Sequence, residues 1–174
     1  MARKKQPQNL WSKIAYLFVI FCIFVFANLY CSDLIVHQIQ NGATLNNNLF
    51  SLNYVQNSGA AFSILHNYPF LLIALSVIAL VFLFSYIIRH AGTMSYAGIF
   101  WLAVMMSGIF CNLYERVMLG YVRDFINLTF VNFPVFNFSD MLINISVFAI
   151  IILLLKRTQL KQLWNLLLMK MMKT

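Results

Sequence analysis

Four long runs of apolar residues dominate the chain, and shorter polar segments separate them. The runs cover about residues 14–32, 69–88, 95–113 and 138–155. A helix needs about 20 mostly apolar residues to cross roughly 30 Å of hydrocarbon, and each run is close to that length. The pattern therefore predicts four transmembrane helices in a single integral membrane domain over residues 1–174.

The segments between these runs differ in length and pattern. Residues 33–68 form a long outer segment, and within it residues 49–55 alternate in part between apolar and polar, which predicts a hairpin or small sheet on the membrane surface. Residues 114–137 form a second long connection, and residues 89–93 form a short turn. The predicted fold class is a membrane all-α bundle of four transmembrane helices, with a small β platform on the outer face.

The tail, residues 156–174, mixes basic residues with Leu, Trp and Met. Such a mixture is typical of an interfacial helix on anionic lipid. The first apolar run follows basic residues, as the core of a cleavable signal peptide would. It is longer than such a core and three more spans follow it, so we interpret it as a retained helix.

Composition and charge agree with a membrane protein. Hydrophobic residues make up 62% of the chain, charged residues only 9%, and the net charge is +8. With four spans, ten of the twelve Lys and Arg residues flank the helices on the same side of the membrane as the N-terminus. Only Arg116 and Arg123 lie on the opposite side. Basic flanks stay preferentially in the cytoplasm, so both termini are predicted to be cytoplasmic. The charge then reflects topology and attraction to lipid, and we expect no nucleic-acid partner.

The three cysteines, Cys22, Cys31 and Cys111, show no spacing typical of a metal site or a disulfide framework. They are interpreted as buried small hydrophobic residues. The sequence also lacks the common metalloprotease, P-loop and nucleotide-binding motifs. We therefore expect neither a metal nor another cofactor.

The predicted topology brings all four acidic residues to the outer face of the membrane. They are Asp33, Glu115, Asp124 and Asp140. Carboxylates avoid the bilayer centre because burying one there costs roughly 3 kcal/mol or more. That cost explains their absence from the spans, but it does not explain why the inner loops contain none.

Helical spacing places polar residues in two stripes. On the fourth helix the stripe comprises Asn137, Asp140 and Asn144. On the third helix it comprises Gly108, Asn112, Glu115 and Arg116. Such stripes face the interior of a bundle and can act purely as structural contacts, with glycine permitting close packing. A structural role and a catalytic role both remain open from spacing alone.

Two carboxylates that share a site cannot both ionise easily, so one stays protonated while the other serves as a base. Such a pair can activate water and then protonate a leaving amine, which are the two steps of peptide hydrolysis. The histidines, His37, His66 and His90, are scattered along the chain and supply no comparable set.

Four segments resemble motifs of lipoprotein signal peptidase, the signal peptidase II family of aspartic peptidases. They are NYVQNSGAAFSIL (residues 53–65), GIFCNLYER (108–116), GYVRDFI (120–126) and FPVFNFSD (133–140). The resemblance covers nearly the whole chain, in order. It implies removal of the signal peptide from a lipid-modified prolipoprotein by a cut before the diacylglyceryl cysteine. It also implies a bacterial inner-membrane location with the active site on the outer side, contact with membrane lipid, and a monomer.

Motif positions imply roles for particular residues. Asp124 and Asp140 correspond to the catalytic pair of the family. The residues that would bind substrate or shape the site are Asn57, Gly59, Asn112, Arg116, Asn137, Asp33 and Glu115.

The chain departs from the family pattern at four positions, where Glu115, His37, Cys111 and Ser139 replace the usual Asp, Lys, Gly and Ala. None of these changes removes a catalytic aspartate. Because His37 lies four residues after Asp33, an acid and base pair at this helical spacing is kept only when the histidine is protonated. Two alternatives to the peptidase are a non-catalytic membrane scaffold or small transporter, and a homologue that binds prolipoproteins without cutting them.

Overall fold

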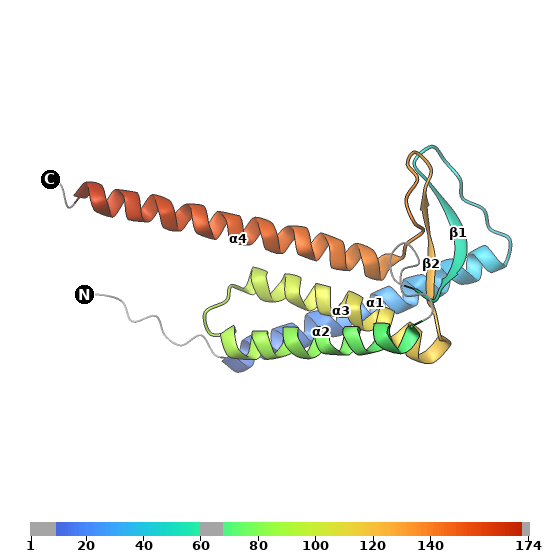
Figure 1. The fold of residues 1–174 in the computed structure, drawn as a ribbon, viewed down its shortest axis with the longest axis horizontal. Helices are drawn as coiled ribbons and strands as arrows, with labels where there is room; N and C mark the ends of the chain where they lie inside the picture. Colours follow the sequence, from blue (N-terminus) through green and yellow to red (C-terminus); the bar gives the residue numbers. More distant parts are fainter. Residues whose placement is uncertain (1–9, 60–67, 172–174) are drawn as a thin grey trace.

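The computed structural model describes residues 10–59 and 68–171. Within them lie four long helices and one two-stranded sheet at one end of the helices (Figure 1). The helices are α1 (Leu10–Gln40), α2 (Pro69–His90), α3 (Tyr96–Leu119) and α4 (Phe138–Met171), and the strands are β1 (Phe50–Asn57) and β2 (Val122–Leu128). All four helices are long and apolar enough to cross a membrane. The predicted fold class, a four-helix membrane bundle with a small sheet, is confirmed.

Three of the four helices extend beyond the apolar runs that predicted them. α1 continues to Gln40, through the first part of the predicted outer segment. α3 continues to Leu119, and α4 runs without a break through the predicted tail to Met171. Hydropathy detects only the lipid-facing length of a helix, whereas backbone hydrogen bonding continues into polar surroundings until a residue ends it.

Local signals set several helix ends. Pro69 begins α2, where its missing N–H costs no hydrogen bond. The Ser95 hydroxyl caps α3 by accepting a hydrogen bond from the Gly98 N–H. Gly120 ends α3 with a φ of 85°, a left-handed conformation that glycine adopts without steric cost. This turn leads directly into β2 and thereby places β2 beside the end of α3.

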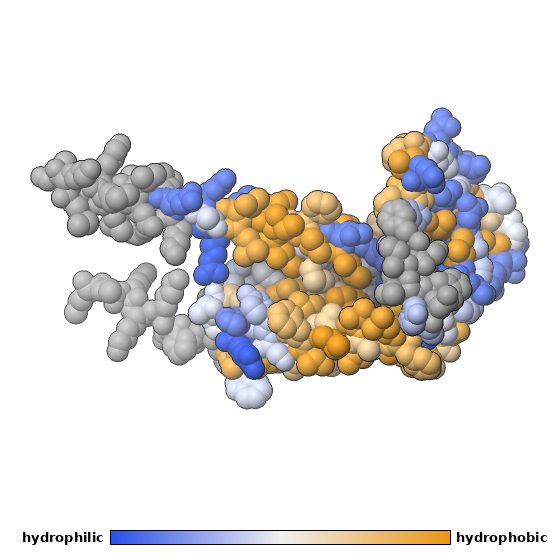
Figure 2. All heavy atoms as spheres, viewed as in Figure 1, coloured by the Kyte–Doolittle hydropathy of each residue, from blue (hydrophilic) through white to orange (hydrophobic). Residues whose placement is uncertain are grey.

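The α3 helix lies at the centre of the bundle, and α1, α2 and α4 each pack against it. Half of its most apolar stretch is buried inside the protein, compared with 11% for each of the other helices. The outer helices therefore present broad apolar surfaces, visible along the sides of the bundle in Figure 2. Such exposure suits a lipid environment. Cys22 and Cys31 are also exposed, so the expectation that the cysteines are buried holds only for Cys111.

The helices α3 and α4 approach each other closely at Gly108. A Cβ atom at this position would lie 2.6 Å from the Ser139 carbonyl oxygen and 2.9 Å from the Ile143 side chain. A side chain would therefore force the helices apart. Because Asn112 is one turn beyond Gly108, this contact brings Asn112 against Asp140 at the start of α4.

At the opposite end of the bundle, Lys13 joins α1 to the turn between α2 and α3. Its ammonium group donates hydrogen bonds of 2.8 Å to the carbonyl oxygens of both Ala91 and Met94. Only 1% of Lys13 is exposed. In the sequence this lysine belongs to the basic flank. In the structure its positive charge also stabilises the carbonyl groups that are left unpaired at the end of α2.

The sheet pairs β1 with β2 in antiparallel register, with Val55 opposite Asp124. The sequence predicted a strand near β1 but sought its partner within the same segment. The partner instead comes from the connection between α3 and α4, for which the sequence predicted no strand. A pairing between segments this far apart has no local signal, because the partner strand is chosen by the packing of the helices.

Candidate active site

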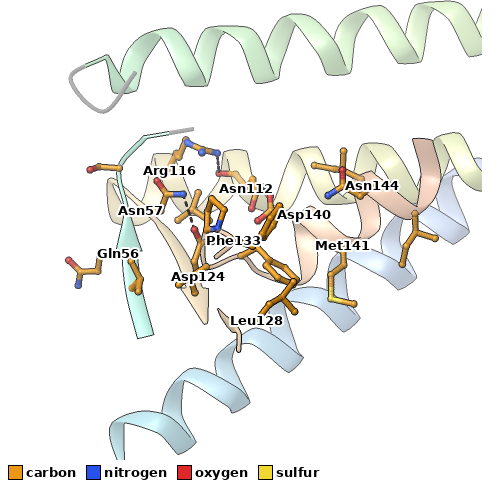
Figure 3. A pocket seen from close by; sticks show the side chains of 18 residues that line it. Gln56, Asn57, Asn112, Arg116, Asp124, Leu128, Phe133, Asp140, Met141 and Asn144 are labelled. Carbon is orange, nitrogen blue, oxygen red and sulfur yellow. Dashed lines mark hydrogen bonds between the residues drawn. The ribbon is translucent and has the colours of Figure 1, made fainter. Parts of the chain in front are cut away.

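A cavity of about 780 Å³ opens between the sheet and the first turns of α4. Polar side chains from four elements line its inner part, as Figure 3 shows: Asn57 of β1, Asn112 and Arg116 of α3, Asp124 of β2 and Asp140 of α4. Apolar side chains complete the wall, including Leu128, Phe133, Met141 and Ile143. The cavity thus combines two carboxyl groups with an apolar surface.

Asp124 is held inside the protein by two amide groups. Only 2% of the residue is exposed. The Asn57 amide donates to Asp124 Oδ2 at 2.8 Å, and the Asn137 amide donates to Asp124 Oδ1 at 2.9 Å. Burial, helped by the nearby Asp140 charge, raises the pKa of Asp124 to about 7, although the two amide donors and the Arg116 charge oppose the shift. Asp124 is therefore suited to hold a proton near neutral pH.

Asp140 is placed by the N-terminus of α4. Asn137, the residue before the helix, accepts a hydrogen bond from the Asp140 N–H at 3.0 Å. In return, Asp140 Oδ2 accepts from the Asn137 N–H at 3.2 Å. This reciprocal arrangement is a capping box in which Asn and Asp replace the more usual Ser and Glu. It places the carboxylate in the first helical turn, where the helix dipole stabilises negative charge.

A chain of amide groups joins the two aspartates. The Asn137 amide NH₂ donates to Asn112 Oδ1 as well as to Asp124, and the Asn112 amide NH₂ donates to Asp140 Oδ1 at 2.9 Å. The orientation of Asn137 is set because its own oxygen accepts from the Asp140 backbone. That orientation in turn sets the orientation of Asn112. Asn137 therefore contacts both carboxyl groups directly.

Arg116 connects α3 to the end of β1. Its guanidinium donates to the carbonyl oxygen of Gly59 at 2.9 Å and to that of Asn112 at 3.2 Å. The Gly59 N–H in turn donates to Asn57 Oδ1, which fixes the Asn57 amide so that its NH₂ faces Asp124. Residues 60–65 of the motif that begins at residue 53, and His66, lie outside the described residues.

A second polar network lies beside the cavity, centred on Arg123. Its guanidinium donates to Glu115 Oε1 at 2.6 and 2.8 Å and to Asp33 Oδ1 at 2.6 Å. The Arg123 N–H also donates to Glu115 Oε2 at 2.8 Å. Glu115 and Asp33, two predicted site residues, therefore bind Arg123 and do not line the cavity.

Two sequence inferences change as a result. The Asp33–His37 pair, conditional on a protonated histidine, is not formed in this structure: Asp33 binds Arg123, and the His37 ring lies 3.1 Å from the Asn41 amide. The sequence motifs also predicted no role for Arg123. A usable signal was present, because Arg123 is one of only two basic residues on its side of the predicted bundle and directly precedes Asp124.

Comparisons with known proteins identify the family. The chain matches the signal peptidase (SPase) II family over residues 18–156. It is 36% identical to the lipoprotein signal peptidase of Streptococcus agalactiae over 113 residues, which are 63% of this chain and 70% of that protein. It is 37% identical to the one from Lactiplantibacillus plantarum over 121 residues, or 68% of this chain and 79% of that protein.

Solved structures agree with the sequence comparisons. A bacterial membrane enzyme determined at 2.3 Å superposes with a TM-score of 0.73 and 26% identity, over 83% of this chain and 90% of that one. A second, determined at 1.9 Å, gives a TM-score of 0.70. The chain therefore belongs to the signal peptidase II family and is a peptidase. With its four apolar helices, it is a multi-pass protein of the bacterial inner membrane.

Proposed function

We propose that the protein is an aspartic endopeptidase that removes signal peptides from lipid-modified prolipoproteins, cutting before the diacylglyceryl cysteine. One observation carries the aspartic mechanism: Asn137 donates a hydrogen bond to each of the two aspartates that share the cavity. Two carboxyl groups in one site influence each other's ionisation, so one can act as acid while the other acts as base. The relatives' name supports the substrate class.

The two environments suggest separate roles. Asp124, whose pKa is raised to about 7, begins the reaction protonated. Asp140, at the positive end of the α4 dipole, begins as the carboxylate. Asp140 removes a proton from a water molecule while the water oxygen attacks the scissile carbonyl carbon. Asp124 gives its proton to the carbonyl oxygen, and a neutral gem-diol results.

Breakdown of this intermediate restores both groups. Asp140 returns its proton to the leaving nitrogen as the C–N bond breaks. One diol hydroxyl gives its proton to Asp124 and becomes the carbonyl of the new carboxyl group. Water is consumed, an acid and an amine are released, and Asp124 is again protonated. The amide chain through Asn137 and Asn112 keeps both carboxyl groups oriented throughout the cycle.

The site is proposed to lie at the outer boundary of the bilayer, with both termini in the cytoplasm. The distribution of basic residues supports this orientation, and so does the shape of the bundle, because the start of α1 and the end of α4 lie at the end opposite the sheet (Figure 1). A signal helix could then approach from the lipid while its diacylglyceryl group stays in hydrocarbon. We further propose that the enzyme works as a monomer without a metal or other cofactor.

The test is cleavage of purified precursors in detergent micelles. Wild-type protein should shorten a lipidated precursor, and Asp124→Asn or Asp140→Asn should lower kcat at least about a thousandfold, the scale of acid–base catalysis. Asp33→Asn is the matched control, because it makes the same chemical change outside the cavity. Cleavage at the wild-type rate by either cavity variant would disprove the mechanism. Equal cleavage of an unlipidated precursor would disprove the proposed substrate class.

A further inference from the structure

Asn144 lies one helical turn beyond Asp140 on α4 and lines the same cavity (Figure 3). Its side chain is exposed, and it makes no hydrogen bond to any described part of the chain. The asparagines that surround the two aspartates differ in this respect. Asn57, Asn112 and Asn137 each donate to an aspartate. Asn144 is therefore a polar group of the cavity that the catalytic network does not use.

The position of Asn144 within a membrane-spanning helix makes an unused amide costly. The residue is within the apolar stretch of α4, with Ile143 and Ile145 on either side. An amide without a partner is strongly unfavourable in an apolar medium, so polar residues in spans face protein or a cavity. No described residue forms a hydrogen bond with this amide, so it is available to a molecule that enters the cavity.

A peptide substrate has groups that match this amide. The catalytic groups can reach the scissile bond only where the substrate backbone is extended. An extended backbone lacks the internal hydrogen bonds of a helix, so its N–H and C=O groups are left unpaired near hydrocarbon. An asparagine side chain offers both a donor and an acceptor, as a peptide group does. Asn144 can thus replace the hydrogen bonds that the unwound signal segment gives up.

Helix and strand dimensions indicate which part of the substrate lies there. Four residues of helix span about 6 Å, and an extended chain covers that length in about two residues. The direction from Asp140 to Asn144 leads away from the sheet and toward the middle of α4. Building on the proposed function, we propose that Asn144 binds the signal-peptide backbone about two residues before the scissile bond.

The first experiment measures cleavage of a lipidated precursor by Asn144→Leu. Loss of the amide should lower kcat/KM about tenfold, the effect of leaving one buried polar group of the substrate unpaired. Most of that loss should be in KM, with kcat changed little. Asn144→Gln, which keeps the amide, should recover part of the loss. Phe148→Leu changes an exposed residue of the same helix outside the cavity and should leave both constants unchanged.

Stability separates substrate binding from a structural role. Asn144→Leu should keep or raise Tm in detergent, because it replaces an unpaired amide with an apolar group. A lower Tm together with an unchanged KM would assign Asn144 to helix packing and overturn the proposal. A change in oligomeric state, measured by light scattering in detergent, would assign it to a contact between copies and would also overturn it.

A second experiment locates the substrate group. A series of synthetic lipidated precursors carries one amide-to-ester replacement each, at successive positions before the cut. At the position that faces Asn144, the ester should weaken cleavage by wild-type protein but not by Asn144→Leu, since the lost contact is already absent. Equal ester effects in both proteins at every position would overturn the proposal. If Asp140→Asn stays inactive in that case, the proposed function is unaffected.

Discussion

Arg123 and Asp124 are consecutive residues of β2, yet they belong to two different polar networks. Side chains alternate between the faces of a strand, so Asp124 turns into the cavity and Arg123 turns toward α1 and α3. Around Asp124, the partners are the amides of Asn57 and Asn137. Around Arg123, the partners are the carboxylates of Glu115 and Asp33.

The difference lies in what each set of partners does to charge. Burial opposes the charge of Arg123, but its hydrogen bonds to Glu115 and Asp33 raise its pKa above the ordinary value, so it stays a cation. Neutral amides orient Asp124 without supplying a full opposite charge, and burial raises its pKa to about 7. The Arg123 network therefore stabilises structure, whereas the aspartate network can exchange protons.

The largest effect on the Arg123 network is expected from Glu115→Gln. Only 6% of the Glu115 side chain is exposed. Removing its negative charge would leave the largely buried Arg123 guanidinium with Asp33, an exposed residue, as its carboxylate partner. Breaking such a pair costs about 3 kcal/mol. We expect a correspondingly lower free energy of unfolding, together with a lower kcat because β2 also carries Asp124.

Thermal or denaturant unfolding in detergent tests this expectation, with activity assayed on the folded fraction. Unchanged stability in Glu115→Gln would show that Arg123 does not anchor β2. A shifted pH profile would show that the two networks are not separate, because Glu115 is not among the groups that shift the pKa of Asp124.

The next effect concerns the pH dependence of catalysis. If Asp124 must begin protonated, kcat should fall about tenfold per pH unit above about pH 7, where that proton is lost. The measurement is kcat for a lipidated precursor across pH 5.5 to 8.5 at saturation. A rate that stays constant to pH 8.5 would contradict the assigned role of Asp124. Glu115→Gln, although slower, should keep the same inflection.

Stability should respond to the same proton. The folded state holds it up to about pH 7, whereas the unfolded chain releases it near the ordinary value of 3.8. The stabilisation is thus complete below about pH 4 and is lost as the pH rises to about 7. Asp124→Asn should remove this part of the pH dependence. Parallel Tm profiles of wild type and variant from pH 4 to 8 would contradict the raised pKa.

The smallest effect is expected from Asp33→Asn. Its side chain is 66% exposed, so the pair with Arg123 is screened by solvent. An exposed ion pair contributes about 1 kcal/mol or less. Stability and kcat should therefore change little, and added salt should reduce the difference further. A loss as large as that of Glu115→Gln would show that both carboxylates are needed to hold Arg123.

Much of this architecture was predictable because it depends on local patterns. Apolar runs of about 20 residues predicted all four helices, since the bilayer sets a length that each span must meet. Helical phase put Asp140 and Asn144 on one face of α4. The resemblance to a known family directed attention to Asp124, Asn57 and Asn112, and the structure brings these residues into one cavity with Asp140.

Other features depended on which elements meet. The strand partner of β1 follows from the turn at Gly120, which carries β2 back across the end of α3. The buried position of Lys13 depends on three carbonyl groups of a distant turn. Neither contact has a signal within its own segment, because each involves residues more than 60 positions apart.

By itself, the sequence determined the number of spans, the polar stripes and the supply of acids and amides. The tertiary structure alone decided how those groups are paired. Glu115 and Asp33 bind Arg123, and Asp124 and Asp140 bind Asn137. Asn144 has no hydrogen-bond partner within residues 10–59 and 68–171. The reason is physical: residue type sets what a group can bind, but burial and distance decide what it does bind, and both arise only when the helices pack.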